Sequence, residues 1–304
     1  MPTKFSLKLA DGSSWQFIAF GKAKPWLRKL ARIMKLKKKS NKKAVNVFIL
    51  FQDGSNLPGI AKIPLLYRNN LPLKGWQSNG DQQAERWTHP QRSHTIFVLR
   101  KPFNHQAMII QMWRTLAPVY EQVIANGGLA FHAGLIVRNK KGVLLSAPGG
   151  TGKSTCCRRV PKPWQAWCDD ECLIVKTRND YRVHPFPTWS EYLGDQKCQH
   201  SWPTMQSACL SNIYFLEQAT KEGVEPIHPG VATVLIHHTA KDMTQKAWPQ
   251  PKTAFPLNMK HKIFINACRL AKKISCFNLK VERFGKFWNN IMSRQSENVR
   301  FLAK

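Results

Sequence analysis

One stretch, Ser146–Thr155, constrains this chain more than any other, and it reads Ser-Ala-Pro-Gly-Gly-Thr-Gly-Lys-Ser-Thr. The apolar run Val-Leu-Leu at 143–145 precedes it and is typical of a buried strand, and residues 154–160 can open a helix. A strand, a glycine-rich turn and a helix in this order form a phosphate-binding loop, whose backbone N–H groups point inward at an anion. The sequence therefore predicts an α/β unit that binds nucleotide phosphates. A glycine-rich turn that binds nothing is the alternative interpretation.

The residue types in this loop match the chemistry of a polyphosphate. Glycines allow the backbone to bend around the anion, and the helix N-terminus adds partial positive charge. Lys153 is placed to reach the β- and γ-phosphates, and the Ser154 hydroxyl to ligate Mg²⁺. The expected phosphate-binding residues are Gly149, Gly150, Thr151, Gly152, Lys153, Ser154 and Thr155. One position departs from the usual pattern, because Ala147 stands where glycine is usual.

The second unusual feature is the charge. The 304 residues include 47 Lys and Arg against 17 Asp and Glu, which gives a formal net charge of +30. Such a field attracts polyanions, acidic peptides or anionic membrane surfaces, and it specifies no catalytic chemistry. Hydrophobic residues make up 43% of the chain, which is enough for a core and excludes a disordered chain. The length predicts one large or two modest domains.

We expect a cytoplasmic protein. The first ten residues hold no long apolar segment of the kind found in secretory signals, and no run of about 18 apolar residues predicts a transmembrane helix. None of the eight cysteines forms a C-x-x-C pair. Without a secretion signal, reduced thiols are the expectation.

Residues 1–125 are expected to form an N-terminal α+β region. Asp11-Gly12, between two alternating segments, predicts a β-hairpin, and Asp53-Gly54 is expected to close a buried strand. The expected strands of this region are residues 5–9, 15–18, 45–51 and 95–99. The apolar spacing at 105–125 predicts one helix kinked at Pro118, which Asn126-Gly127-Gly128 then ends.

A basic segment, residues 22–43, lies inside this region. Eleven of its residues are Lys or Arg and none is acidic. Apolar residues recur through it at helical spacing, namely Trp26, Leu27, Leu30, Ile33, Met34 and Leu36. This predicts an amphipathic helix whose basic face is simply solvated, or docks an acidic peptide or protein, or binds nucleic acid or an anionic membrane. No helix-turn-helix, zinc-finger or RNA-recognition pattern favours a sequence-specific nucleic-acid reader.

Residues 126–304 are expected to form a second domain around the glycine-rich loop. Asn139–Gly142 reads as a tight turn before the loop strand, and the His237-His238 pair as strand or loop surface. The expected strands are residues 129–137, 142–146, 173–175, 181–183, 213–216, 231–236 and 277–282. Residues 257–271 are expected to be partly helical, and a short helix to follow 285–288.

Three further residues are candidates for chemistry beside the loop. His132 lies on the expected strand before the loop strand, 21 residues ahead of Lys153, and Asp169 and Asp170 follow Lys153 by 16 and 17 residues. That spacing fits one helix and one strand returning beside the loop strand. A carboxylate there can hold Mg²⁺ or accept a proton from an attacking hydroxyl, and a nearby histidine can tune its pKa. Taken alone, an ordinary strand histidine and a solvated acidic turn are the alternatives.

Together these motifs carry a family resemblance. They read Phe131-His132-Ala133-Gly134, Gly142-Val143-Leu144-Leu145, Gly149-Gly150-Thr151-Gly152-Lys153-Ser154-Thr155 and Asp169-Asp170. The arrangement resembles the catalytic domain of HPr kinase/phosphorylase, including the His-to-Lys offset. The chain looks most similar to the SynChlorMet cassette ScmC group, judged by Leu9–Ser13 with Trp15, the 26–34 helix and His184-Pro185-Phe186-Pro187. The resemblance implies an α/β fold: a P-loop kinase core of the HPr kinase C-terminal-domain type at 126–304, with the α+β region attached.

The resemblance also implies roles for the site residues. Lys153 and the loop amides would bind ATP and Ser154 would ligate Mg²⁺, while Asp169 would act as general base toward a serine or threonine hydroxyl, adjusted by His132. Asp170 would sit near the metal. HPr kinases carry a Glu-Arg-Gly signature whose glutamate completes the metal site, and this chain has none. Glu191 is the candidate substitute, and HPr itself is not the expected substrate.

Three functions follow as expectations. The first is an ATP- and Mg²⁺-dependent kinase of an acidic peptide or protein, acting in ribosomal-peptide maturation beside other maturation enzymes. The second, favoured by the absent Glu-Arg-Gly, is a non-catalytic nucleotide-binding scaffold of a peptide-maturation complex. The third, suggested by the charge, is a nucleic-acid-associated ATPase. The oligomeric state stays open: HPr kinases assemble into rings, and the alternatives for this chain are a homo-oligomer and a chain that does not form rings.

Overall fold

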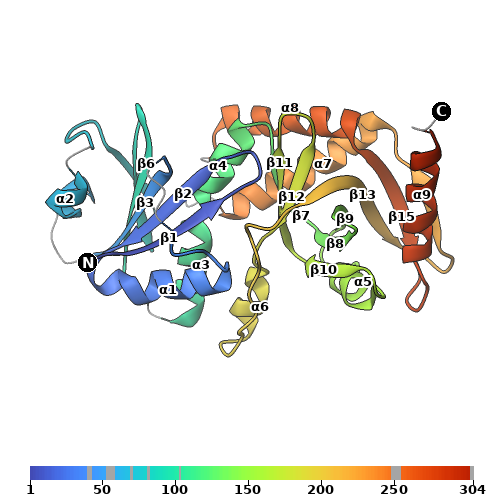
Figure 1. Ribbon diagram of the computed structural model, residues 1–304, viewed down its shortest axis with the longest axis horizontal. Coiled ribbons are helices and arrows are strands. Elements are labelled where there is room, and N and C mark those ends of the chain that lie inside the picture. Colours follow the sequence, from blue (N-terminus) through green and yellow to red (C-terminus); the bar gives the residue numbers. More distant parts are fainter. Residues whose placement is uncertain are drawn as a thin grey trace.

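The computed structural model describes residues 1–39, 43–52, 59–68, 71–80, 83–102, 104–247 and 255–301, with side chains to residue 294. Figure 1 shows an elongated molecule whose two termini lie at opposite ends. A sheet near the N-terminus occupies one half, a second sheet occupies the other, and helices pack between and above them. The expected mixed α/β class is confirmed.

The first sheet has six strands within the described residues, in the order β1-β2-β3-β6-β5-β4. They are β1 (Thr3–Lys8), β2 (Ser14–Ala19), β3 (Val45–Phe51), β4 (Gln77–Gly80), β5 (Ala84–His89) and β6 (Arg92–Leu99). The expected hairpin is confirmed, because β1 and β2 pair antiparallel from Thr3↔Ala19 to Lys8↔Ser14. β3 pairs in parallel with both β2 and β6. The expected turn at Asp53-Gly54 lies outside the described residues.

The expected amphipathic helix is α1 (Lys24–Ile33), the crossover from β2 to β3. Pro25 lies in its first turn, where a missing N–H costs nothing. Its apolar residues face the core and are buried, namely Trp26, Leu27, Leu30, Ala31 and Ile33. Lys42, in the expected basic segment, lies outside the described residues. A single short turn, α2 (Leu65–Arg68), precedes β4.

The single helix expected at 105–125 is wrong, because the chain forms two helices there. They are α3 (His105–Arg114) and α4 (Ala117–Ala125). Asn104 caps α3 by accepting a hydrogen bond from the N–H of Ala107. Pro118 lies in the first turn of α4, so it starts a new helix instead of kinking an old one. The expected C-cap is confirmed: Gly127 has φ +89°, and the Gly128 N–H donates to the Val123 carbonyl.

The second sheet contains the strand that leads into the glycine-rich loop. Its strands are β7 (Leu129–His132), β8 (Gly134–Arg138), β9 (Lys141–Ser146), β10 (Gln165–Cys168), β11 (Glu171–Lys176), β12 (Tyr181–Pro185), β13 (Ala208–Gln218), β14 (Gly223–Pro226) and β15 (Ser275–Val281). The main order is β10-β8-β9-β13-β12-β11-β7, and β15 joins β13 to β14. The expected hairpin of β11 and β12 and the turn at Asn139-Lys140 are confirmed, with φ +51° and +61° at the two turn residues.

The single strand expected at 129–137 is wrong, because it divides at Ala133. β7 pairs with β11, whereas β8 pairs with β9 and β10. The Ala133 N–H leaves the ladder to donate to the Asp170 carbonyl. β7 is the last strand of this order and β8 is the second from its other end, yet the two follow one another along the chain. The sheet therefore curls until its two edges approach each other at this point.

The prediction of which strand lies beside the loop strand is also wrong. We expected the strand leading to Asp169 to lie directly beside β9. Instead β10 pairs antiparallel with β8, and the neighbours of β9 are β8 and β13. One strand therefore separates β10 from the loop strand, and the curl of the sheet brings Asp169 back toward the loop.

The strand expected at 231–236 is wrong, because these residues begin helix α7 (Pro229–Ala247). The β-branched run there favours a strand locally. Tertiary packing decides otherwise: Ala232, Ile236 and Ala240 recur every four residues and are buried, while Val231 and Val234 remain 56% and 51% exposed. His237 and His238 consequently lie on a helix, not on a strand or loop.

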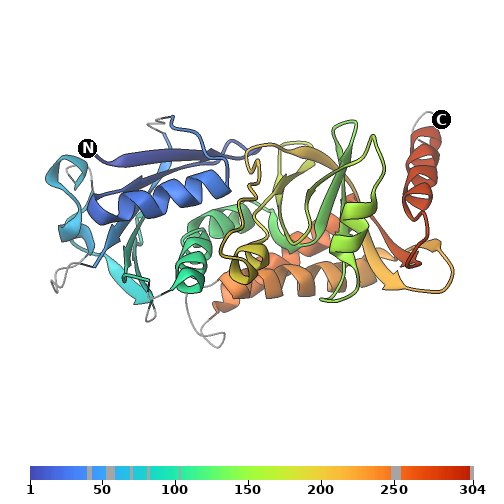
Figure 2. The same cartoon turned by 90° about the horizontal axis from the view of Figure 1, so that it is seen from below.

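Two long helices, α7 and α8 (Leu257–Lys273), cover one side of the second sheet, as Figures 1 and 2 show. α5 (Lys153–Arg159) and α6 (Trp189–Gly194) lie near its other side, and α9 (Trp288–Phe301) lies by the C-terminus. The expected helices after 154, 257 and 285 are thereby confirmed. Among the described residues, no helix combines the length and the apolar character of a membrane span.

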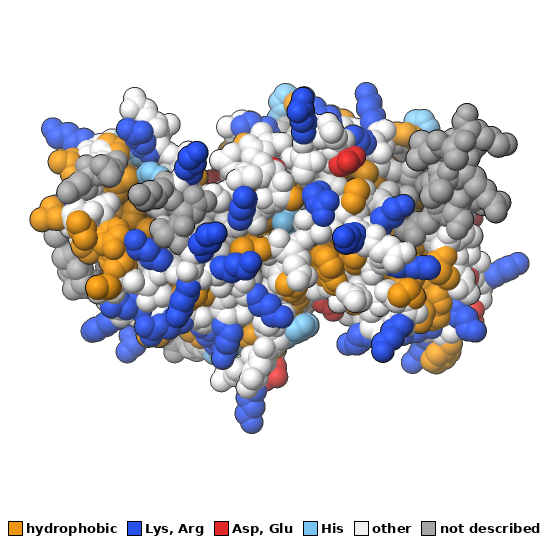
Figure 3. Space-filling view, in the orientation of Figure 1, with side chains coloured by type: hydrophobic (Ala, Val, Ile, Leu, Met, Phe, Trp, Pro, Cys, Tyr) orange, Lys and Arg blue, Asp and Glu red, His pale blue; other side chains and the backbone are white. Residues whose placement is uncertain are grey.

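One hydrophobic core runs through both halves, and it includes Trp15 of β2, Tyr120 of α4 and Trp189 of α6. Backbone contacts also join the halves, since the Trp202 N–H donates to the Ile33 carbonyl at 2.8 Å. The division into domains at residue 125 stays a prediction. Lys and Arg side chains are spread over the face drawn in Figure 3, with few Asp or Glu among them.

Candidate functional site

The glycine-rich loop joins β9 to α5, as the sequence predicts. Gly150 and Gly152 have φ of +80° and +103°, in the left-handed region that favours glycine. A methyl group at either position would meet no atom within 4 Å. Backbone conformation, and not lack of space, therefore requires these two glycines.

Ala147 is the one departure from the usual loop pattern, and the structure explains why it is tolerated. Among the described residues, the non-glycine positions with positive φ are Lys35, Asn139 and Lys140. Ala147 is therefore in a conformation open to any residue, and its side chain is buried in the small apolar cluster under the loop.

Lys153 is the first residue of α5 and is only 7% exposed. Its ammonium donates to the carbonyls of Ala147 and Pro148, at 2.6 and 3.1 Å. Burial lowers the pKa of Lys153, and the carboxylate of Asp170 acts in the opposite direction. The loop thus holds the Lys153 ammonium against two of its own backbone carbonyl oxygens.

Asp169 and Asp170 form the turn between β10 and β11, and residues around the start of α6 contact both of them. The Thr188 hydroxyl donates to Asp169 Oδ1 at 2.7 Å, and the Ser190 hydroxyl lies 3.4 Å from Asp170 Oδ2. Two hydroxyls from one short segment therefore orient the two neighbouring carboxylates.

His132, at the end of β7, contacts Asp170 rather than Asp169. Its Nδ1 lies 2.8 Å from the Asp170 carbonyl oxygen and 2.9 Å from Asp170 Oδ1. Both partners are acceptors, so Nδ1 carries the hydrogen. Burial opposes ionisation of Asp170, but the hydrogen bond and charge of His132, with the charges of Lys246 and Lys153, hold its pKa below the usual value. Asp170 is consequently an ionised carboxylate.

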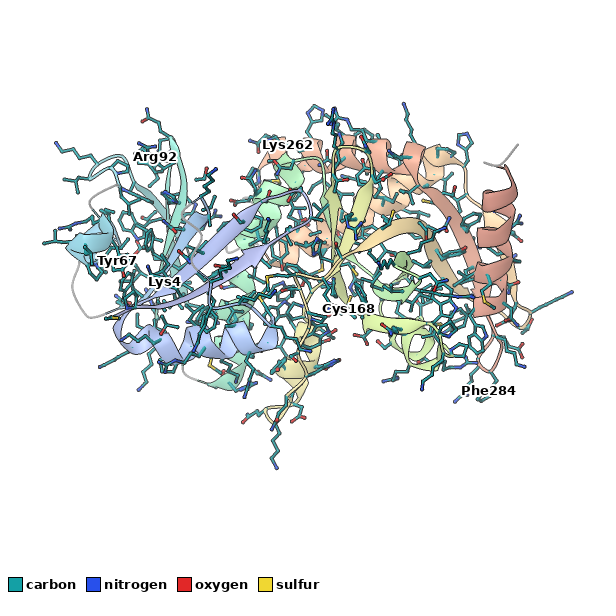
Figure 4. All side chains as sticks on the ribbon, viewed as in Figure 1. Lys4, Tyr67, Arg92, Cys168, Lys262 and Phe284 are labelled. Atoms are coloured by element: carbon teal, nitrogen blue, oxygen red, sulfur yellow. The ribbon has the colours of Figure 1, made fainter. Side chains whose placement is uncertain are left out.

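These groups line one cavity of about 580 Å³. Its lining residues are His132, Gly149, Gly150, Gly152, Lys153, Ser154, Thr155, Arg158, Asp169, Asp170, Thr188, Ser190 and Glu191. Figure 4 labels Cys168, the residue just before Asp169, beside β10 and α5. Of the predicted site residues, Thr151 alone is absent from this lining, and its hydroxyl donates to the Pro148 carbonyl at 3.0 Å.

Several cavity residues were missed by the sequence reasoning. Arg158 follows the loop by one helical turn, and Thr188 and Ser190 flank the predicted Glu191. Lys246 of α7 is outside the cavity lining but acts electrostatically on Lys153 and Asp170. Only Arg158 could have been recognised in the sequence, because it is a cation one turn into the helix that follows the phosphate-binding loop. Nothing local to 188–190 or 246 indicates that they approach residue 170.

Glu191, the predicted substitute metal ligand, lies in the cavity lining but has another partner. Its Oε2 is 3.0 Å from Nδ1 of His200, and the Cys198 thiol lies 3.9 Å from the same oxygen. The carboxylate is thus shared between the cavity and the segment that follows α6.

A buried carboxyl lies behind the site. Glu171 is the β-ladder partner of His132 and is fully buried, and the Tyr120 hydroxyl of α4 donates to it. Burial raises the pKa of Glu171 to about 8, against the effect of the Tyr120 hydrogen bond. Glu171 is therefore held mainly as the neutral acid near pH 7, and it connects the site to α4 of the N-terminal half.

The donor set suits Mg²⁺ with a polyphosphate better than a metal held by protein alone. In the part of the chain that the structure describes, no group of three or more His, Cys, Asp and Glu side chains is arranged to hold a metal ion. Mg²⁺ typically takes one or two carboxylates and completes its shell with water and phosphate oxygens. Ser154, Asp170 and Glu191 in one cavity with Lys153 fit that arrangement.

Comparison with known proteins supports one part of the predicted family resemblance, the similarity to the ScmC group. No curated protein matches the chain significantly. A family model described as SynChlorMet cassette protein ScmC matches residues 96–294, which run from β6 into α9 and include every residue of the cavity. The chain therefore belongs to the SynChlorMet cassette protein ScmC family.

Proposed function

We propose that this chain is an ATP- and Mg²⁺-dependent kinase, related to the HPr kinases, that phosphorylates a serine or threonine hydroxyl of a peptide or protein. The observation that carries the proposal is one cavity that holds the loop lysine, Lys153, together with the carboxylates of Asp169 and Asp170. Phosphoryl transfer needs positioning and charge neutralisation more than covalent catalysis, and this set provides both.

Nucleotide binding is the task of the loop and of Lys153. Gly150 and Gly152 bend the backbone, so that its N–H groups can face an anion, and the ammonium of Lys153 lies buried against carbonyls. Exchanging a carbonyl for a phosphate oxygen gives this cation a charged partner. Ser154 and Asp170 would hold Mg²⁺, and bound ATP would supply the phosphoryl group.

In this proposal Asp169 takes the proton of the acceptor hydroxyl. Its carboxylate lines the cavity, and the Thr188 hydroxyl fixes its orientation through Oδ1. A general base must be oriented within hydrogen-bond reach of the proton that it removes. Asp170 is held instead by His132, so the two neighbouring carboxylates are divided between a base and a metal ligand.

Transfer of label tests the proposal. The protein is incubated with γ-³²P-ATP, Mg²⁺ and a panel of acidic peptides that contain serine or threonine, beside the Lys153→Ala and Asp169→Asn variants. The expected result is label on a peptide hydroxyl with the wild type and none with either variant. Label on no peptide despite tight ATP binding, or wild-type turnover by Lys153→Ala, would contradict it.

A non-catalytic scaffold is the second candidate, and one observation favours it. Glu191, the only proposed substitute for the glutamate of the absent Glu-Arg-Gly, is engaged by His200. A carboxylate oxygen that already contacts His200 is less available as a ligand for a metal ion. Tight nucleotide binding with no transfer, unchanged in His200→Gln, would favour the scaffold, whereas ATP hydrolysis stimulated by DNA or RNA would favour a nucleic-acid-associated ATPase.

A further inference from the structure

α1 carries a stripe of cations along its solvent-facing side. Lys24, Arg28 and Arg32 are spaced four residues apart, which places them on one side of a helix. Arg28 and Arg32 are exposed, and the opposite side of α1 is buried in the core. We call these three residues the α1 stripe.

The α1 stripe has no acidic partner within the described residues. The ion pairs recorded there join Arg86–Glu121, His132–Asp170, His200–Glu191, Lys273–Asp180 and Lys280–Glu225, and none includes a residue of α1. The helix itself contains no Asp or Glu. Two exposed arginines and a half-buried lysine in one row, without a counter-charge, form a surface suited to an anionic partner.

The stripe leads toward the candidate site. At the end of α1 the Ile33 carbonyl accepts from the Trp202 N–H, and the Met34 carbonyl accepts from the Thr204 hydroxyl, both at 2.8 Å. Residues 202–204 follow α6, whose start lines the cavity through Ser190 and Glu191.

α1, α6 and α5 also succeed one another along one side of the molecule in both Figure 1 and Figure 2. On the α5 side of the cavity, exposed Arg158 continues the positive charge.

We propose that the α1 stripe docks an acidic segment of the peptide or protein whose hydroxyl enters the cavity. The proposal deepens the kinase function and rests on it for the fate of that hydroxyl. Lys24 to Arg32 spans roughly 12 Å along the helix, the length of about four extended residues. The partner is therefore a short run of Asp and Glu set apart in sequence from its serine or threonine.

The cavity itself favours a peptide over a nucleic acid. Asp169, Asp170 and Glu191 line it, and a phosphodiester backbone that continued from the stripe into the cavity would bring its negative charges against theirs. A peptide can carry carboxylates over the stripe and still present an uncharged hydroxyl to the carboxylates. Charge thus changes sign from the α1 stripe to the side of the cavity that Asp169, Asp170 and Glu191 line, and a partner with a matching change fits both.

Peptide binding without catalysis tests the docking separately from the kinase. The probe is a fluorescein-labelled peptide with four acidic residues followed by a Gly-Ser-Gly tail, titrated by anisotropy against protein carrying Lys153→Ala. The test variant adds Lys24→Gln, Arg28→Gln and Arg32→Gln, and glutamine keeps good helix propensity. The matched control removes three exposed cations from α8, by Lys262→Gln, Arg269→Gln and Lys272→Gln. α8 lies on the side of the molecule opposite α1, where Figure 4 labels Lys262.

The expected result is a Kd about tenfold weaker for the α1 variant, as loss of three surface ion pairs implies, and a change under about twofold for the α8 control. Equal weakening by both variants, with unchanged far-UV circular dichroism, would show attraction by overall charge only and would overturn the proposal. The proposal would also be overturned if the α1 substitutions weakened binding of a single-stranded DNA 10-mer more than binding of the peptide.

Kinetics separates failure of the docking from failure of the kinase. If the wild type transfers phosphate, the same three α1 substitutions in a chain that keeps Lys153 should raise KM for the acidic peptide about tenfold and leave kcat unchanged, as removal of uniform binding does. A KM unchanged in that variant would overturn the docking while the kinase stands. If no transfer occurs but the tenfold difference in Kd persists, the kinase fails and the docking surface stands.

Discussion

The ammonium nitrogen of Lys153 lies 2.6 Å from the carbonyl oxygen of Ala147, the residue that replaces the usual first glycine of the loop. The cation is thus held by the backbone of its own loop. Since Ala147 is not among the described residues with positive φ, the substitution leaves this contact undisturbed. An incoming phosphate would compete with a carbonyl for a cation that is already positioned.

Lys153→Ala should weaken ATP binding about 10- to 100-fold, because a hydrogen bond to a charged group contributes about 1.5–3 kcal/mol. Anisotropy of a fluorescent ATP analogue measures this. Lys221→Ala removes an exposed lysine from another loop and serves as the matched control. Equal affinity in both variants would exclude Lys153 from phosphate binding.

Asp169→Asn should retain ATP affinity and lose phosphate transfer about 10²- to 10⁴-fold, the usual contribution of a general base. Asparagine keeps the acceptor oxygen for the Thr188 hydroxyl but cannot take a proton. The measurements are label transfer and thermal melting. A variant that melts well below the wild type would instead assign Asp169 a structural role, and Asp195→Asn, at an exposed position, is the control.

Thr188→Val should lower transfer about tenfold while leaving ATP affinity intact. Valine matches the shape of threonine but removes the hydroxyl that donates to Asp169 Oδ1 at 2.7 Å. The comparison is kcat against that of Thr233→Val, whose hydroxyl donates within α7 away from the cavity. Transfer equal to the wild type in Thr188→Val would show that this contact does not orient the base.

Gly152→Ala should destabilise the protein by about 1–2 kcal/mol, whereas Gly149→Ala should be nearly neutral. Neither added methyl meets an atom within 4 Å, so the two positions differ in backbone conformation, with φ +103° at Gly152 and no positive φ at Gly149. Urea denaturation of both variants measures the difference. Equal stability would mean that the loop rearranges at no cost.

His184 should make stability depend on acid pH. Its Nδ1 lies 2.9 Å from the Thr204 carbonyl and its Nε2 accepts from the Ala10 N–H at 3.2 Å, so both nitrogens are satisfied only in the neutral ring. Burial lowers its pKa to about 4 from 6.5. Between those values the unfolded chain binds more protons, so the free energy of unfolding should decrease as the pH is lowered, by up to about 1.4 kcal/mol per pH unit.

Urea denaturation at pH 7 and pH 5 checks this. The stability of His184→Gln should change less between the two pH values than that of the wild type or of His261→Gln, which replaces an exposed histidine. The same loss in all three proteins would assign the acid sensitivity to other groups.

Local patterns in the sequence determined much of the molecule. The loop, its strand and its helix form where Ser146–Thr155 predicts them, and the hairpin around Asp11-Gly12 and the amphipathic α1 are equally local. Turn residues and apolar periodicity act over a few residues, so they can be recognised without knowing what lies nearby in space. Asp169, Asp170 and His132 are likewise recognisable from their residue types and their spacing to Lys153.

Which of these elements meet depends on contacts between residues far apart in the sequence. The break at Ala133 curls the second sheet and brings Asp169 and Asp170 to the loop, although β8 separates β10 from β9. Packing against the sheet turned a β-branched run at 231–236 into α7. Thr188 joined the site through a hydrogen bond to a residue 19 positions away. Long-range contacts of this kind depend on the whole core, and no local pattern contains them.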